Sequence, residues 1–230
     1  MPMAKNLVEL RDVYKIYGEG RESEVRALDG VSLTIGKGEF VAVVGQSGSG
    51  KSTMMNVLGC LDIPTRGTYL LGGTDVRELT DKELSHIRNK QIGFIFQQYN
   101  LIQSLTVLEN VELPLIYQGV NADDRRDMAL EALARVGLAN RIKHRPVEMS
   151  GGQQQRVAIA RALAAKPAIL LADEPTGNLD SKTSQDVMGL LKVTSQRFAQ
   201  TIVMITHNEE IAQMADRIVR IEDGRITSRG

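Results

Sequence analysis

The sequence predicts an α/β fold, in which short strands and helices alternate to form a mixed sheet with flanking helices. Two stretches of five apolar residues, Phe40–Val44 and Ala168–Ala172, are typical of strands buried on both faces of a sheet. Helical patterns separate these strands along the chain. The 230 residues, 42% of them hydrophobic, are enough to bury the core of one such domain.

The predicted elements fall into three parts. The first part has strands at residues 7–13, 31–35, 40–44, 68–71 and 92–96, and a helix at 50–61. The second part, about residues 101–165, is mainly helical, with Asn121 as the N-cap of one helix and a second helix at 152–165. The third part has strands at 168–172 and 201–205, helices at 184–197 and 209–215, and a hairpin at 218–226. The hairpin turns on Asp223-Gly224, a pair typical of two-residue turns.

The balance of charges gives no support for a protein that coats DNA or RNA. Lys plus Arg and Asp plus Glu both number 28, whereas proteins that bind polyanions usually have a basic excess. The single cysteine can form neither an internal disulfide nor a cysteine metal cage, which fits a reducing compartment. Apolar runs such as residues 169–172 are far shorter than a membrane span.

A phosphate-binding loop follows the strand at 40–44. The residues match the pattern GxxxxGK[ST] in full and are Gly45, Gln46, Ser47, Gly48, Ser49, Gly50, Lys51 and Ser52, with Thr53 next on the helix. Glycines let the backbone N–H groups and the helix N-terminus approach a phosphate closely. Lys51 would reach the β- and γ-phosphates, and Ser52 would offer its hydroxyl to Mg²⁺. The pattern predicts nucleotide binding.

The phosphate-binding loop alone leaves kinases, GTPases and ATPases open. An acidic pair narrows the choice, because Asp173 and Glu174 end the strand at 168–172. Ligands of open α/β sheets bind at that edge. Asp173 can hold Mg²⁺, and Glu174 can act on an attacking water as a general base. Without the loop, the same pair would be interpreted as solvated acids that end a strand before Pro175.

The segment Met149-Ser150-Gly151-Gly152-Gln153 resembles the signature motif of ATP-binding-cassette (ABC) ATPases, LSGGQ, with Met149 in place of Leu. A serine and two glycines at a helix N-terminus form a second anion site, because N–H groups and the helix dipole point outward there. Read alone, the segment is only a loop followed by an N-cap.

Four further motifs follow the order of the ABC family. The resemblance implies that Gln97, in the Q-loop at residues 93–98, senses Mg²⁺ and the attacking water. Asp180 ends the family's D-loop, and His207 matches the switch histidine that contacts the γ-phosphate. Tyr17 matches the adenine-stacking aromatic, whose ring face stacks without base-edge specificity. The implied catalytic residues are Glu174, His207 and Gln97, and the implied Mg²⁺ ligands are Ser52, Gln97 and Asp173.

The resemblance also implies the domain organisation. A single ABC ATPase domain at residues 1–230 is expected, with a P-loop NTPase core that includes an N-terminal antiparallel β portion. Residues 1–96 and 166–230 would form the catalytic lobe, and residues 97–165 the ABC-type helical lobe that carries the signature.

The finer resemblance is to the ATPase subunits of lipoprotein-releasing, macrolide-export and cell-division-type transporters. It rests on the residues at 55–62, 106–111, 150–156 and 176–180. It implies ATP and Mg²⁺ as cofactors and an ATP-dependent, head-to-tail homodimer in which Ser150, Gly151, Gly152 and Gln153 act in trans. A membrane permease, as a subunit or a fused domain, and an extracytoplasmic adaptor are the other implied partners. The resemblance implies that the protein is located at the cytoplasmic face of the cell membrane.

Other functions stay open at this point. An importer or a cell-division-type complex would use the same motifs. An ABC ATPase that acts on DNA or on the ribosome would carry a long heptad coiled coil or two cassettes, and the 230 residues contain neither. A P-loop kinase would leave residues 150–153 and His207 without a role. Export is the direction that the resemblance favours.

Overall fold

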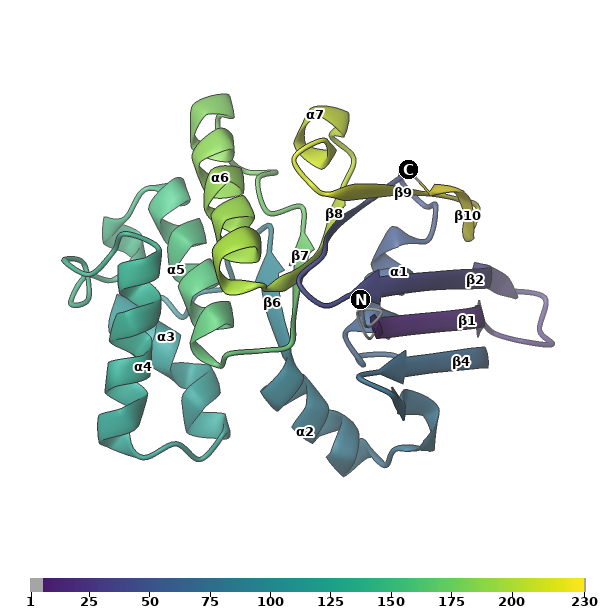
Figure 1. The fold of residues 1–230 in the computed structure, drawn as a ribbon, viewed down its shortest axis with the longest axis horizontal. Helices are drawn as coiled ribbons and strands as arrows, with labels where there is room; N and C mark the ends of the chain where they lie inside the picture. The colour runs from purple at the N-terminus through teal and green to yellow at the C-terminus, as the bar shows by residue number, and fades with distance from the viewer. Residues whose placement is uncertain (1–5, 230) are drawn as a thin grey trace, which may run out of the picture.

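The computed structural model describes residues 6–229, so residues 1–5 and 230 of the expected domain lie outside the described part. It contains a small antiparallel sheet, a larger central sheet and a group of helices on the opposite side of that central sheet (Figure 1). This arrangement confirms the predicted fold class, a mixed sheet with flanking helices, a helical part and an N-terminal antiparallel portion.

The antiparallel sheet has four strands in the order β2-β1-β4-β5. They are β1 (Asn6–Tyr17), β2 (Val25–Gly36), β4 (Arg66–Leu71) and β5 (Thr74–Asp75). β1 and β2 are longer than predicted, because they pair with each other along almost their whole length and β1 also pairs with β4. Such pairing is not visible in the local sequence pattern.

The central sheet has six strands in the order β10-β9-β3-β8-β7-β6. They are β3 (Phe40–Val44), β6 (Ile92–Phe96), β7 (Ile169–Asp173), β8 (Thr201–Thr206), β9 (Arg217–Glu222) and β10 (Arg225–Arg229). The four pairings from β6 to β9 are parallel, and only β10 runs antiparallel to its neighbour β9. The carboxyl ends of β3, β7 and β8 therefore lie side by side at one edge.

The helices are α1 (Lys51–Leu58), α2 (Asp81–Gln91), α3 (Val107–Tyr117), α4 (Ala122–Arg135), α5 (Gly151–Ala164), α6 (Ser181–Phe198) and α7 (Glu209–Ala212). Short 3-10 turns lie at Val76–Glu78 and Pro146–Glu148. The predicted N-cap is confirmed, because the Asn121 side chain accepts a hydrogen bond from the Asp124 N–H at the start of α4. The helix α2 was not predicted, although Thr80 and Glu83 form a capping box at its start.

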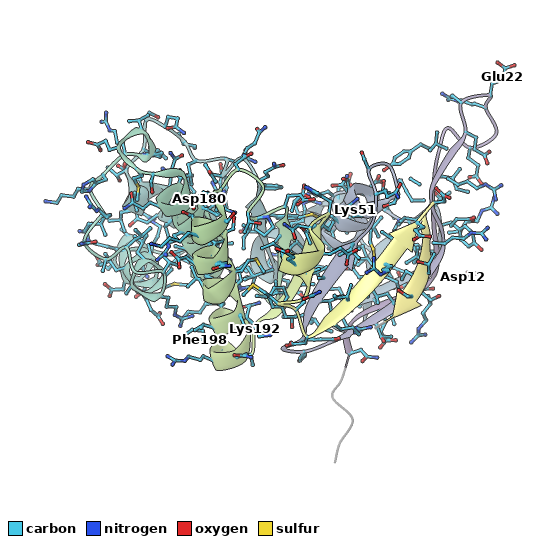
Figure 2. The ribbon with its side chains drawn as sticks, turned by 90° about the horizontal axis from the view of Figure 1, so that it is seen from above. Asp12, Glu22, Lys51, Asp180, Lys192 and Phe198 are labelled. Atoms are coloured by element: carbon cyan, nitrogen blue, oxygen red, sulfur yellow. The ribbon has the colours of Figure 1, made fainter. Side chains whose placement is uncertain are left out.

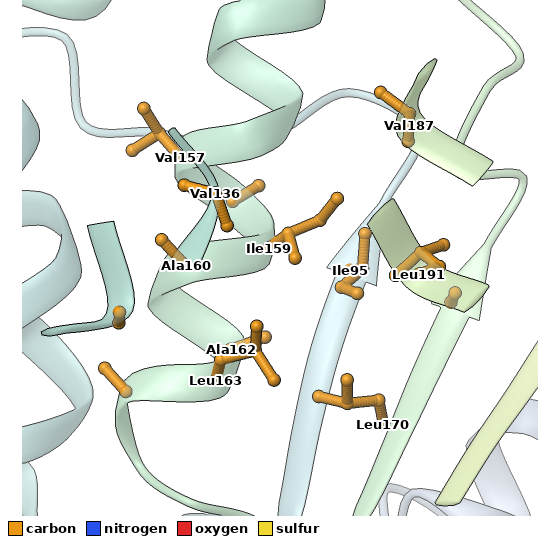
Figure 3. Close-up of a cluster of buried hydrophobic side chains, with 14 of the residues drawn as sticks. Ile95, Val136, Val157, Ile159, Ala160, Ala162, Leu163, Leu170, Val187 and Leu191 are labelled. Atoms are coloured by element: carbon orange, nitrogen blue, oxygen red, sulfur yellow. The ribbon is translucent and has the colours of Figure 1, made fainter. Parts of the chain in front are cut away.

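Two hydrophobic cores lie on the two faces of the central sheet. Along β3, Phe40, Ala42 and Val44 belong to the core that includes α3, α4, α5 and α6. Val41 and Val43 belong to the other core, with α1 and the antiparallel sheet. Figure 3 shows the first core, in which side chains of α5 meet those of β6, β7 and α6. The strand is buried on both faces, as its uninterrupted apolar sequence predicts.

Candidate functional site

The loop between β3 and α1 leads into a helix start that no side chain caps. Gly50 precedes α1 with φ 104°. A Cβ atom at Gly50 would lie 2.4 Å from the carbonyl oxygen of Ala27, so both the conformation and the close approach require glycine here. An uncapped helix start with its dipole directed outward can bind an anion.

This loop borders a cavity of about 780 Å³. The predicted site residues that line it are Ser47, Gly48, Gly50, Lys51, Ser52, Thr53, Gln97, Asp173, Glu174 and His207. The remaining lining residues were not predicted from the sequence and are Val25, Arg26, Ala27, Ile205, Asp223 and Gly224. Gln46, Ser49 and Gly45 lie in the same loop beside two smaller hollows that adjoin it. One cavity thus gathers residues that the sequence separates by more than one hundred positions.

The Lys51 ammonium group is held by the loop itself. Its Nζ atom donates hydrogen bonds to the carbonyl oxygens of Gly45, at 2.7 Å, and Gln46, at 2.6 Å. The amine therefore lies within the curve of the loop. A polyphosphate that enters the cavity would offer it anionic oxygens, which bind an ammonium group more strongly than carbonyl oxygens do.

Glu174 has a strained backbone and a tightly held carboxylate. Its φ is 44°, a left-handed conformation that is rare outside glycine, and its N–H donates to the Ile205 carbonyl at 2.9 Å. The Oε1 atom accepts from the His207 N–H at 2.9 Å and lies 2.6 Å from His207 Nδ1. Thr206 donates its hydroxyl to Oε2 at 3.2 Å. The carboxylate is thereby fixed at the end of β7, where it can accept a proton from a bound water.

Asp173 is half-buried beside Glu174, and the structure gives its carboxylate a raised pKa. Burial is the main cause, and the neighbouring Glu174 adds to it, whereas Lys51 acts in the opposite direction. The Asp173 carboxylate and the Ser52 hydroxyl line the same cavity. Carboxylate and hydroxyl oxygens are the ligands that Mg²⁺ prefers, so this donor set fits the predicted ion.

Replacing Asp173 by Asn is expected to raise the free energy of unfolding at neutral pH. The folded protein holds the Asp173 carboxylate at a raised pKa, so its ionised form opposes folding above that pKa. The gain should shrink as the pH falls through the raised pKa and vanish below the ordinary pKa of Asp. Urea unfolding at several pH values measures it.

Asp180 supplies a control of opposite sign for that experiment. Its pKa is lowered by hydrogen bonds from Thr183, so its ionised form supports folding and Asp180→Asn should destabilise the protein at neutral pH. That loss should fade as the pH falls through the lowered pKa. An Asp173→Asn protein that is less stable than wild type at neutral pH would contradict the assignment.

Gln97 reaches the cavity but bonds to the segment that follows β7. Its Nε2 donates to Asn178 Oδ1 at 3.2 Å, and Asn178 Nδ2 donates to the Gln97 carbonyl at 3.0 Å. Two hydrogen bonds therefore join the Q-loop and the D-loop, one between side chains and one from the Asn178 side chain to the backbone. Asn178 lies within the D-loop motif, but the sequence gives no sign that it faces Gln97, 81 residues away.

Tyr17 lies beside the cavity and does not line it. The side chain is 41% exposed, and its hydroxyl donates to Asp62 Oδ2 at 2.9 Å. The hydroxyl also contacts Thr53, which does line the cavity. Burial and the Asp62 carboxylate raise the pKa of the Tyr17 phenol, so the group stays protonated and acts as a donor.

The signature residues form the start of α5. Ser150 is the N-cap, with its hydroxyl accepting from the Gln153 N–H, and Gln153 Oε1 accepts from the Ser150 N–H at 3.1 Å. A Cβ atom at Gly152 would lie 2.2 Å from Thr183 Cγ2, so α5 and α6 could not approach as they do with a larger residue. Asp180 caps α6 by accepting from Thr183. Signature and D-loop are thus neighbours.

The signature residues and Asp180 are not part of the cavity. None of Ser150, Gly151, Gly152, Gln153 and Asp180 is among its lining residues. Figure 2 shows Asp180 at one end of α6 and Lys51 well apart from it across the molecule, with Phe198 at the other end of α6. Within one chain, the two predicted anion sites remain separate.

The loop, the acidic strand end and the histidine around one cavity define a P-loop nucleotide-binding protein. Comparison with known proteins gives the family: a model of the ABC transporter family matches residues 28–177. The chain belongs to that family and is an ATP-binding cassette with ATPase function. The resemblance on which the sequence interpretation rested is confirmed.

Relatives of known sequence support this assignment. A macrolide export ATP-binding/permease protein MacB from Hyphomonas neptunium is 53% identical over 226 residues, which cover 98% of this chain and 35% of that protein. An uncharacterized ABC transporter ATP-binding protein from Thermotoga maritima is 53% identical over 222 residues, covering 96% of this chain and 94% of the other. The chain therefore spans about a third of the MacB protein and nearly all of the Thermotoga protein.

Solved structures agree on the fold. The dimeric structure of MJ0796, a bacterial ABC transporter cassette, has a TM-score of 0.86 and 48% identity, and the match covers 97% of both chains. A dimeric post-hydrolysis state of the same cassette, with ADP and phosphate, matches equally well. Among the helices of residues 6–229, none combines the length and the apolar character that a bilayer crossing needs.

Proposed function

We propose that this chain is the ATPase subunit that powers a membrane permease, and that it works with Mg²⁺ as an ATP-dependent homodimer at the cytoplasmic face of the membrane. The observation that carries the proposal is the separation of the two anion sites. Lys51, Glu174 and His207 surround one cavity, whereas Ser150 caps a helix elsewhere. A second copy can supply the missing signature.

The residues of the cavity have different roles in binding and hydrolysing ATP. Lys51 and the N–H groups of the loop bind the phosphates. Ser52, Asp173 and Gln97 would hold Mg²⁺, which would supply charge neutralisation at the phosphates. Glu174 orients and deprotonates the attacking water, and His207, which contacts Glu174 in this structure, contacts the γ-phosphate when nucleotide is present. The Gln97 side chain, which donates to Asn178 in this structure, would have to release Asn178 in order to serve as a ligand.

Two-fold symmetry explains how the signature completes the site. When two chains face each other head to tail, the exposed Ser150 of each lies against the phosphate-binding loop of the other, which gives two composite sites. The N-terminal N–H groups of α5 then face the γ-phosphate. ATP binds the closed dimer better than the open chains and therefore closes it, and hydrolysis reopens it. MJ0796, at 48% identity, is itself a dimer.

A second hollow, of about 640 Å³, is the expected binding site of the permease. It lies between α2, β6, α3 and α5, and its lining is mostly apolar, with the stacked rings of Phe94 and Phe96 at 5.7 Å and the exposed Tyr117. Phe96, which precedes Gln97 directly, and Asn100, which follows shortly after it, also line the hollow. An amphipathic helix of a permease that binds here would contact the Q-loop directly. The helical lobe at residues 97–165 supplies one wall.

The relatives indicate the class of transport. The MacB proteins from Hyphomonas neptunium and Chlorobaculum tepidum carry the words export and permease in their names, and this chain is 53% identical to each. We extend this to an export or extrusion role, of macrolides, lipoproteins or peptides, with an extracytoplasmic adaptor as a further partner.

Stimulation of ATPase activity by proteoliposomes that hold the candidate permease tests this function. Tyr117→Asp places a charge in the apolar hollow and is expected to lower the stimulation at least about fivefold while the basal activity is kept. Ile116→Asp is the matched control, because Ile116 is the preceding residue of α3, is 49% exposed and does not line the hollow. Stimulation by DNA or by a small acceptor, with none by the permease, would contradict the proposal.

A further inference from the structure

A three-residue network holds the ring of Tyr17. The Asp62 carboxylate accepts from the Tyr17 hydroxyl through Oδ2 at 2.9 Å, and its Oδ1 forms an ion pair with Lys15. Lys15 Nζ also donates to the Ile63 carbonyl at 3.0 Å and lies over the Tyr17 ring, 5.1 Å from the ring centroid. Each of the three side chains therefore contacts the other two.

The Asp62 carboxylate is fixed by the segment that ends α1. The predicted helix at 50–61 stops at Leu58, and Cys60 adopts φ 52°. The N–H groups of Leu61 and Asp62 both donate to the Asn56 carbonyl, at 2.9 and 3.2 Å, which folds the segment back on the helix. The Ile63 N–H donates to Asp62 Oδ1 at 2.9 Å. The carboxylate thus has a set position relative to the helix that begins at the phosphate-binding loop.

The network covers one face of the ring and leaves another side of it open. The Lys15 side chain is only 14% exposed and lies against the ring, where a cation is attracted to the π-electrons. The Tyr17 side chain nevertheless keeps 41% of its surface exposed. Thr53, which contacts the Tyr17 hydroxyl, lines the nucleotide cavity, so Tyr17 lies at the margin of that cavity.

We propose that Asp62 and Lys15 are positioning residues for Tyr17, which hold the ring in one orientation so that the adenine of ATP stacks on its open face. The proposal rests on the proposed function, in which the cavity binds ATP beside Tyr17. A side chain that is ordered before binding loses less conformational entropy when the base arrives. Asp62 is itself held against α1, because its N–H donates to the Asn56 carbonyl of that helix.

Binding of ATP and of inorganic tripolyphosphate, each measured by calorimetry, tests the proposal. Tyr17→Ala is expected to raise the Kd of ATP on the order of tenfold, and Asp62→Ala about threefold. Neither should change the Kd of tripolyphosphate, which has no base to stack. Glu19→Ala is the matched control. Glu19 follows β1 and forms an ion pair with Arg66 of β4, so its replacement should leave both Kd values unchanged.

The double variant Tyr17→Ala/Asp62→Ala separates positioning from folding. Without the ring, Asp62→Ala should have no further effect on the Kd of ATP. It should still lower the thermal stability, because the ion pair of Asp62 with Lys15 is broken in both backgrounds. An equal effect of Asp62→Ala with and without the ring, or an effect on tripolyphosphate, would overturn the proposal.

Two other results separate this inference from the proposed function. If Tyr17→Ala weakens ATP but Asp62→Ala does not, the positioning role is wrong and the nucleotide site stands. If wild-type protein binds neither ATP nor tripolyphosphate, the proposed function itself fails, and the inference fails with it.

Discussion

Glu174→Gln is expected to lower the rate of ATP hydrolysis on the order of 10²-fold or more and to leave ATP binding nearly unchanged. The amide keeps the shape of the side chain and one acceptor oxygen, so it can preserve a contact with His207 or Thr206. It removes the carboxylate that takes the proton from water. Steady-state hydrolysis and an ATP-binding titration on the same preparation measure the two effects.

The same variant should accumulate as a dimer when ATP is present. The closed dimer normally reopens after hydrolysis, and this route is blocked when water is not activated. Size-exclusion chromatography at micromolar protein, with and without ATP, measures the shift. If Glu174→Gln stays monomeric with bound ATP, the dimer is not the state from which hydrolysis occurs.

Ser150→Arg is expected to abolish hydrolysis and dimer closure while a single chain still binds ATP. Ser150 caps α5 and is exposed, and it lies outside the cavity that contains Lys51. A long cationic side chain there would block the approach of a second phosphate-binding loop. Lys51→Ala, by contrast, removes the lysine that lies within the loop and should weaken ATP binding itself.

Mixing these two inactive proteins tests whether the signature acts in trans. Consider a heterodimer of one Ser150→Arg chain and one Lys51→Ala chain. If the signature acts in trans, one composite site carries both substitutions and the other site carries neither. Part of the ATPase activity should then return, to at most about half of the wild-type activity per dimer, if one intact site turns over. A signature that acts in cis puts one lesion in each site, and no activity returns. Heterodimers shown to form without any recovery would therefore argue against the head-to-tail arrangement.

Elements with strong local signals were predicted closely. β3 and β6 have the predicted bounds, the N-cap at Asn121 is present, and the hairpin turns on Asp223-Gly224, with positive φ at both residues. In each case neighbouring residues determine the conformation. The helix α2 was missed because only Leu84 and Ile87 of its eleven residues are buried, so it lacks a clear apolar stripe.

The site was predictable where a motif is contiguous. The phosphate-binding loop, Asp173 and Glu174 are each part of a short pattern, and the structure places them around one cavity. Contacts between distant segments were not predictable: Gln97 with Asn178, and Tyr17 with Asp62, are 81 and 45 residues apart. Local patterns contain no information about which polar side chains meet after the chain has folded.

Successive side chains of β7 point alternately into the two cores on either side of the central sheet. Ile169 and Leu171 face the core that contains α1, and Leu170 and Ala172 face the helical core. Asp173, the next odd position, is therefore directed to the side of Lys51 and Ser52. A single inserted residue between Ile169 and Ala172 would turn that carboxylate toward the other layer, so the spacing within an apolar strand is itself a part of the catalytic design.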